Sequence, residues 1–147
     1  AIAGEGTLRA GLERRLDDLG ARQSVTWLGP VDGRRLMSEL DLLVMPSRYE
    51  GFPYVLLEAL HCGVPVIATP VGGVVETNAG GTCGTVVPHN DAPALAQAIE
   101  QLACDSARRS QMAQSARGHA PCFSVAAMAD RIEALYRAGP SALSIGT

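Results

Sequence analysis

The stretch from residue 46 to 68, with the apolar run just before it, constrains the fold of this chain most strongly. The run Leu42–Met45 is typical of a buried strand in a parallel sheet. A loop follows it, and a proline suited to a first helical turn predicts that a helix begins near Pro53. Gly63 is a favourable residue just past a helix end, and residues 64–68 lead into another strand. The stretch therefore predicts one strand–helix–strand unit.

Two carboxylates in this unit indicate a binding site. Glu50 lies in the loop at the carboxyl end of a strand, where open α/β sheets bind ligands. Glu58 lies about one turn into an otherwise apolar helix, where a charge is costly unless it receives hydrogen bonds. Free amides at the helix N-terminus, between the two, attract anions. The order matches the sugar hydroxyls, pyrophosphate and ribose diol of a nucleotide-sugar, because carboxylates accept hydrogen bonds from vicinal hydroxyls.

A purely structural interpretation of the pair is also open. Glu50 could cap the helix, and Glu58 could pair with an arginine. The residues of the pair alone do not decide between this interpretation and a ligand site.

The residues around the pair resemble a known family. Glu50 and Glu58 are separated by seven residues within PSRYEGFPYVLLEALHCGVPVIA, and TPVGGVVE follows. This looks like the signature of glycosyltransferase family four, whose members are retaining, use sugar nucleotides and have the two-domain GT-B fold. Other segments resemble that family in its usual order: AIAGEG at 1–6, VTWLG at 25–29, GTVVP at 84–88 and DAPALAQAI at 91–99.

The alternation of strands and helices predicts an α/β fold with a doubly wound, Rossmann-like parallel sheet. The resemblance implies that the chain is the C-terminal, donor-binding half of a GT-B enzyme. Residues 1–140 are expected to form this nucleotide-sugar-binding domain, truncated at its N-terminus because the chain opens inside an apparent strand. Residues 141–147 are expected to be a loose tail.

The last third of the chain predicts helices. Asp91 and Ser124 are candidate N-caps, and Gly139 with the following proline is a stop signal. Apolar residues recur at helical spacing after each cap. In GT-B enzymes a helix near this end packs back on the other domain, so the resemblance implies the same here.

The resemblance also implies residue roles. Glu50 would be the catalytic residue that holds hydroxyls of the donor sugar, and Glu58 would hold the ribose. The remaining donor-binding residues would be Gly4, Gly6, Arg48, Gly51, Phe52, Val55, Leu56, Gly72 and Gly73. Pro53 stands where the family often has glycine, and proline offers no amide proton there.

The glycines outside the central stretch allow more than one interpretation. Gly4 and Gly6 form a turn after a strand, but a dinucleotide fingerprint needs a third glycine where Arg9 stands, which argues against NAD. Gly72 and Gly73 either let backbone approach a ligand closely or form a flexible turn. Both interpretations of this pair stay open.

Composition narrows the possible partners. A net charge of −3 gives no case for nucleic acid. The cysteines (Cys62, Cys83, Cys104 and Cys122) lack metal-ligand spacing, so reduced thiols of a cytoplasmic protein are expected. No cofactor or metal is expected, because many family members neutralise the leaving diphosphate with arginine, lysine and a helix end. All twelve basic residues are arginine, and the family's diphosphate-binding pair usually lies ahead of Ala1.

The expected function is transfer of a sugar, with retention, from a UDP- or GDP-sugar to a glycan or lipid-linked acceptor. The acceptor would be held by an N-terminal domain, and the full-length enzyme could associate peripherally with the inner face of the membrane. These 147 residues alone are not expected to catalyse transfer. The alternatives are a non-catalytic remnant or binding module, and a GT-B sugar-nucleotide epimerase.

Overall fold

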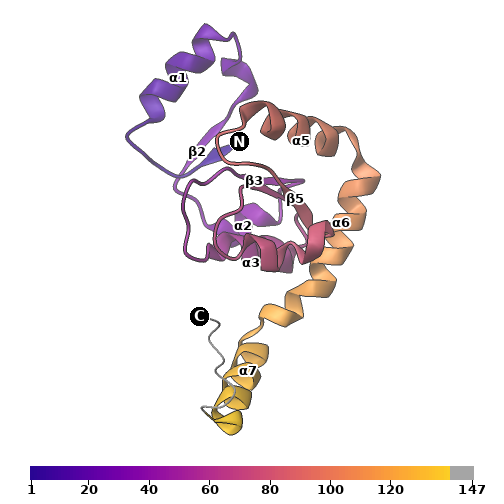
Figure 1. Ribbon diagram of the computed structural model, residues 1–147. Coiled ribbons are helices and arrows are strands. Elements are labelled where there is room, and N and C mark those ends of the chain that lie inside the picture. The colour runs from indigo at the N-terminus through magenta and orange to yellow at the C-terminus, as the bar shows by residue number, and fades with distance from the viewer. Residues whose placement is uncertain (140–147) are drawn as a thin grey trace. The chain divides into compact units, whose positions relative to one another are not determined.

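The computed structural model describes residues 1–139 (Figure 1). The chain divides into two compact units, residues 1–39 and the chain from Leu40 on, and each is described here by itself. The expected single domain over residues 1–140 stays a prediction. The expected tail, residues 141–147, lies outside the described residues.

The first unit is a pair of short parallel strands with helices between and after them. Strand β1 pairs with β2, and Ile2 is opposite Trp27 while Ala3 is opposite Gly29. Its elements are β1 (Ile2–Ala3), α1 (Arg9–Asp18), the 3₁₀ turn η1 (Arg22–Ser24), β2 (Trp27–Gly29) and α2 (Gly33–Met37). Within residues 1–39, Met37 is the buried hydrophobic side chain.

The second unit contains a three-stranded parallel sheet in the order β3-β4-β5. The strands are β3 (Leu43–Met45), β4 (Val66–Ala68) and β5 (Gly84–Val86). Their registers are in step, since Val44 is opposite Ile67 and Ile67 is opposite Thr85. Parallel strands need crossover connections, and the segment between β3 and β4 supplies the predicted strand–helix–strand unit.

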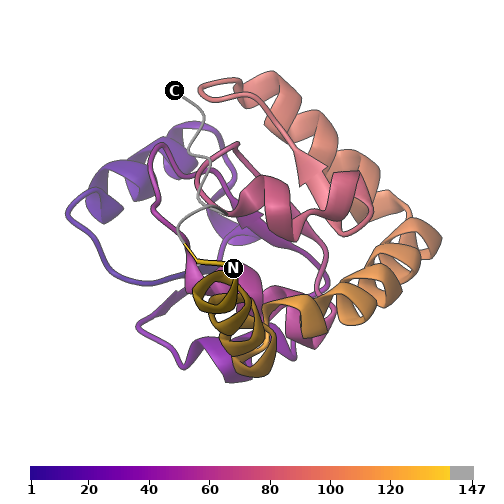
Figure 2. The ribbon, with the colours of Figure 1, turned by 60° about the horizontal axis from the view of Figure 1, so that its bottom comes forward.

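The remaining elements of the second unit are helical. They are α3 (Tyr54–Cys62), α4 (Val74–Thr77), η2 (Ala79–Gly81), α5 (Ala92–Cys104), α6 (Ser106–His119), η3 (Ala120–Phe123) and α7 (Val125–Ala138). Helix α6 contacts both α5 and α3, and Figures 1 and 2 show it running between them.

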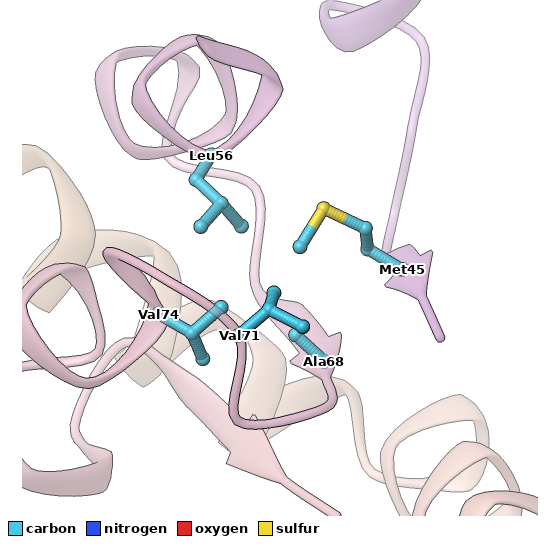
Figure 3. Close-up of a cluster of buried hydrophobic side chains, with 5 residues drawn as sticks. All are labelled: Met45, Leu56, Ala68, Val71 and Val74. Atoms are coloured by element: carbon cyan, nitrogen blue, oxygen red, sulfur yellow. The ribbon is translucent and has the colours of Figure 1, made fainter. Parts of the chain in front are cut away.

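Helices cover both faces of the three-stranded sheet. On one face Met45, Ala68 and the buried Leu56 of α3 pack with Val71 and Val74 (Figure 3). On the other face Ile67 packs with buried side chains of α5 and α6, which are Ala98, Leu102 and Met112. Side chains of adjacent strand residues point to opposite faces of the sheet, so Ile67 and Ala68 pack in separate hydrophobic clusters. This double covering confirms the predicted α/β fold class.

Local sequence signals set the helix ends. Helix α3 begins after Pro53 and ends at Gly63, which is left-handed with φ 69°. Asp91 and Ser124 cap α5 and α7 by accepting hydrogen bonds from the amides of Ala94 and Ala127. These three predictions are confirmed, because glycine tolerates the left-handed conformation and short polar side chains satisfy first-turn amides.

Helix α7 buries none of its side chains within the described part of the chain. Its apolar residues are exposed: Val125, Met128, Ile132, Leu135 and Tyr136. No helix within residues 1–139 has the length and apolar character needed to cross a bilayer.

Candidate functional site

The candidate site occupies the loops that follow β3 and β4, at the carboxyl edge of the three-stranded sheet. Parallel strands bring their carboxyl ends to one edge, so residues 46–53 and 69–73 meet there even though they are about twenty residues apart in the sequence.

Glu50 is half-buried, and two hydroxyls fix its loop. Ser47 Oγ donates to Glu50 Oε1 at 2.9 Å, and Thr69 Oγ1 donates to the Ser47 carbonyl. The second hydroxyl comes from the end of β4, so the loop is fixed by its neighbouring strand. Sequence reasoning missed both hydroxyls, although Ser47 at three residues before Glu50 is a spacing that permits such a bond.

The N-terminus of α3 is open. Pro53 is its N-cap residue and no side chain caps the helix, so Glu50 does not serve as a cap. Within residues 1–139, the amides of Gly51, Phe52, Tyr54 and Val55 donate to no backbone or side-chain acceptor. The Leu56 amide, in contrast, donates to the Pro53 carbonyl at 3.1 Å. The open amides and the positive end of the helix dipole form an anion-attracting surface.

Glu58 lies on α3 and is half-buried. No arginine within the described chain comes within ion-pair distance of it, and no donor of residues 1–139 hydrogen-bonds to it. The arginine pairing that the sequence left open is therefore absent from this part of the chain. Side chains of a helix tilt toward its N-terminus, so Glu58 leans toward the turn that holds the open amides.

The apolar side chains of α3 fix where these groups stand. Leu56 is only 2% exposed and packs in the cluster of Figure 3, and Val55 packs against the same cluster. Their side chains therefore face the core while the backbone at Val55 faces the open end of the helix.

Gly72 and Gly73 allow the two loops to pack closely. A methyl group on Gly72 would collide with the Gly51 carbonyl oxygen, and one on Gly73 would lie 2.5 Å from the Phe52 ring. Gly73 also has φ 78°, a conformation that favours glycine. Because Gly72 and Gly73 have no side chains, the second loop packs directly against the first loop. This packing argues against a flexible turn at these two residues.

Arg48 is exposed and lines a cavity of about 460 Å³ at the ends of all three strands. Thr69 lines it from β4, and His89, Asn90 and Asp91 line it from the loop after β5. Of these loop residues, only Asp91 had a predicted role, as the N-cap of a helix. The signal that could have found them is their position directly after a strand of a parallel sheet.

The other predicted donor-binding residues, Gly4 and Gly6, belong to the first unit. They follow β1, and Gly4 has φ 104°. Their predicted role toward a ligand stays a prediction. Among residues 1–139 no group of three or more His, Cys, Asp or Glu side chains is placed to hold a metal ion.

The fold and the site together define a class of protein. It is a Rossmann-like α/β domain with an anion-attracting helix end between two carboxylates. The family model for glycosyl transferases group 1 matches residues 1–119. The chain therefore belongs to this glycosyltransferase family, and the predicted family resemblance is confirmed.

A curated relative and two solved structures show how much of such a protein is present. The chain is 36% identical over 140 residues to the alpha-D-kanosaminyltransferase of Streptomyces kanamyceticus, covering 92% of this chain and 36% of the relative. Sucrose-phosphate synthase from Thermosynechococcus elongatus superposes with TM-score 0.77 at 34% identity, over 90% of this chain and 34% of that one. Anabaena HepE, solved in complex with UDP, superposes with TM-score 0.79 at 26% identity, over 90% and 40%. The chain thus spans about a third of the length of its curated relatives.

Proposed function

We propose that this chain is the donor-binding half of a retaining glycosyltransferase that uses a nucleotide-sugar such as a UDP- or GDP-sugar. The acceptor would be a glycan or a lipid-linked glycan held by another part of the full-length protein. With a lipid-linked acceptor, that protein would work at the cytoplasmic face of the membrane.

One observation carries this proposal: two half-buried carboxylates flank an open helix end, and the fold uses neither of them to cap or pair. Glu50 receives one hydrogen bond, from Ser47, and Glu58 receives none from residues 1–139. A half-buried carboxylate with so few donors is costly. Vicinal hydroxyls of a sugar or a ribose supply such donors, because an ionised carboxylate accepts at both oxygens. The open amides between the carboxylates suit a diphosphate.

Each residue then has a chemical role. Glu50, oriented by Ser47, would accept hydrogen bonds from hydroxyls of the donor sugar. The backbone at Gly51, Phe52 and Val55 would meet the sugar and phosphates. Glu58 would hold the ribose. Arg48, Gly72 and Gly73 would complete the donor surface within this unit, and Gly4 and Gly6 would contribute from the first unit.

The chemistry sets a charge requirement. During transfer the bond between the anomeric carbon and the diphosphate breaks, the acceptor hydroxyl oxygen bonds to the anomeric carbon on the same face, and the hydroxyl proton passes to the departing diphosphate. The departing diphosphate gains negative charge, whereas a helix end contributes only about half an elementary charge, worth at most ~2 kcal/mol. Arg48 adds one cation near the strand ends. Further positive charge has to come from the rest of the full-length enzyme, which also positions the acceptor.

The structure of HepE with UDP-glucose supports the choice of a first probe. That complex is a property of HepE, which is 25% identical to this chain. We therefore expect UDP-glucose, UDP and GDP to be a sufficient starting panel for the full-length protein that carries these residues.

Replacing Glu58 with Gln tests the proposal. An amide keeps one acceptor oxygen and loses the charge-assisted bond, so affinity for the bound nucleotide should fall by about 1.5–3 kcal/mol, with little change in melting temperature. Isothermal titration with UDP and GDP measures the first quantity, and differential scanning fluorimetry measures the second. Glu100→Gln, at an exposed position on α5, is the matched control.

Two outcomes would contradict the proposal. If the unaltered full-length protein binds none of the probes, the donor-site assignment fails. If Glu58→Gln leaves nucleotide affinity unchanged and lowers the melting temperature, Glu58 has a structural role and the ribose assignment is wrong.

A further inference from the structure

The short segment that joins α6 to α7 contacts the first loop of the candidate site and the helix that follows the second loop. This segment, called here the brace, comprises His119 at the end of α6 and the turn η3 (Ala120–Phe123). It lies more than forty residues beyond both loops in the sequence, and no motif of the family resemblance includes it.

Phe123 reaches the first loop. Its ring centroid lies 6.5 Å from that of Phe52, with the ring planes tilted by 44°. This distance lies within the usual range for paired aromatic rings. The Phe52 ring also lies against Gly73, where an added methyl group would be only 2.5 Å from it. Phe52 is therefore held between the second loop and the brace, even though 43% of it is exposed.

His119 reaches the helix that follows the second loop. Its Nε2 lies 3.1 Å from the Glu76 carbonyl oxygen on α4, and its ring meets Phe123 edge-on at 5.2 Å. A carbonyl oxygen only accepts hydrogen bonds, so Nε2 carries the proton in this contact. His119 thereby links α4, which begins directly after Gly73, to the ring that supports Phe52.

The brace itself is anchored in the core. Ala120 and Ala116 are buried with Leu60 of α3 and Cys83, and Phe123 packs against this cluster. The brace therefore shares a rigid base with the helix that carries Glu58. In contrast, Gly51 and Phe52 are exposed, and their amides make no hydrogen bonds within the described chain.

We propose that Phe123 is a positioning residue for nucleotide-sugar binding. Its ring fixes Phe52, and through Phe52 it fixes the open amides of the donor loop relative to Glu58. This inference rests on the proposed function, because it names the residue that keeps the donor loop in its binding geometry. Phe123 touches neither the substrate nor Glu50; it acts through Phe52.

Hydrogen exchange of the unliganded full-length protein tests the contact without any ligand. Phe123→Leu keeps an apolar side chain against the core and removes the ring. We expect faster exchange confined to the hydrogen-bonded amides nearest the contact, which are those of Leu56 on α3 and of Val74, Thr77 and Asn78 after the second loop. Phe123→Tyr, which keeps the ring, should preserve their protection. Tyr136→Leu, at an exposed position on α7, is the matched aromatic control.

Phe52→Leu provides a second, independent variant. If the two rings act as one unit, Phe52→Leu should produce the same local increase in exchange, and the double variant should add nothing further. Additive increases, an unchanged exchange rate in Phe123→Leu, or a uniform increase that includes β4 would overturn the proposal. A uniform increase is the result of a merely structural role.

Binding and kinetics with UDP-glucose and UDP then connect the brace to function. Misplacing a positioning group by about 1 Å can cost up to about a hundredfold in rate. We expect Phe123→Leu to lower kcat/KM for UDP-glucose by about tenfold. UDP affinity should fall by a smaller factor, because the open amides meet the phosphates of both probes while Glu58 stays in place on α3. An unchanged kcat/KM for UDP-glucose would overturn the proposal.

The two proposals fail in different ways. If the unaltered protein binds no nucleotide-sugar while Phe123→Leu still speeds exchange at the amides of Leu56, Val74, Thr77 and Asn78, the donor assignment fails and the contact stands. If nucleotide binding depends on Glu58 but exchange does not depend on Phe123, the donor assignment stands and the brace fails.

Discussion

The two units of the chain bury their apolar side chains very differently. In the first unit, α1 buries no side chain, and Leu8, Leu12 and Leu19 are exposed. In the second unit, α3 is one residue shorter than α1 and yet buries Leu56, Ala59 and Leu60. Both helices carry leucines at helical spacing, but α1 has six charged residues among ten whereas α3 has one among nine, so α3 has the more apolar surface to bury.

The first unit depends on surface interactions instead. Glu13 on α1 pairs with Arg9 at 3.0 Å and with Arg22 at 3.7 Å, and the Arg9 guanidinium lies 5.1 Å from the centre of the Trp27 ring. Exposed ion pairs of this kind contribute about 0–1 kcal/mol each. The groups that need precise placement, Glu50 and Glu58, stand on the unit with the packed core. The second unit is therefore the scaffold of the site.

The largest expected effect is a loss of stability on truncating a leucine in the second unit, compared with a leucine in the first unit. Leu56→Ala removes a side chain that is 2% exposed and should lower the free energy of unfolding by about 2–5 kcal/mol. Leu12→Ala, at a position 47% exposed, should change it by no more than about 0.5 kcal/mol. Urea denaturation of the full-length protein measures both. Similar losses for the two variants would mean that the first unit has a core of its own.

The next largest expected effect is a loss of turnover without a loss of stability, which distinguishes a site residue from a core residue. Glu50→Gln should lower turnover with UDP-glucose by about tenfold or more, since a charge-assisted hydrogen bond is worth about 1.5–3 kcal/mol. It should leave UDP affinity and melting temperature nearly unchanged, because UDP lacks the transferred sugar that Glu50 would hold. Steady-state assays and isothermal titration distinguish the two, with Glu39→Gln in the first unit as control. A large loss of UDP affinity would count against the sugar role.

The smallest expected effect comes from removing an aspartate N-cap, which each unit contains. Asp91 caps the 13-residue α5 through the Ala94 amide at 2.9 Å, and Asp32 caps the 5-residue α2 through the Arg34 amide at 3.0 Å. Removal of such a cap costs about 1 kcal/mol. We expect that loss for Asp91→Ala and a smaller one for Asp32→Ala, measured by thermal unfolding, because α5 packs on the sheet. A larger loss for Asp32→Ala would reverse the comparison.

Local signals in the sequence predicted much of the second unit. Gly63, Asp91 and Ser124 mark element ends through interactions within four residues, which is the range that a sequence pattern reports directly. The apolar run at 42–45 and the helix after Pro53 were confirmed for the same reason. The strand–loop–helix order then placed Glu50 and Glu58 on either side of a helix end.

Contacts between distant segments could not be predicted in this way. Thr69 donates to the Ser47 carbonyl from 22 residues away, and Phe123 meets Phe52 across 71 residues. Nothing in either local pattern specifies the partner, since only the folded sheet brings them together. Helix α7 shows a further limit of the local pattern: its apolar residues have helical spacing, as predicted, and within the described chain they are exposed.

The paired glycines at 72 and 73 have a consequence for mutational tolerance. A side chain at 72 would collide with backbone, at the Gly51 carbonyl, whereas a side chain at 73 would collide with the Phe52 ring. A second substitution that shortens residue 52 can therefore relieve part of the defect of Gly73→Ala, with the strain of a positive φ remaining. No side-chain change elsewhere relieves Gly72→Ala. Two adjacent glycines with the same apparent intolerance thus differ in kind, since one has a second-site suppressor and the other has none.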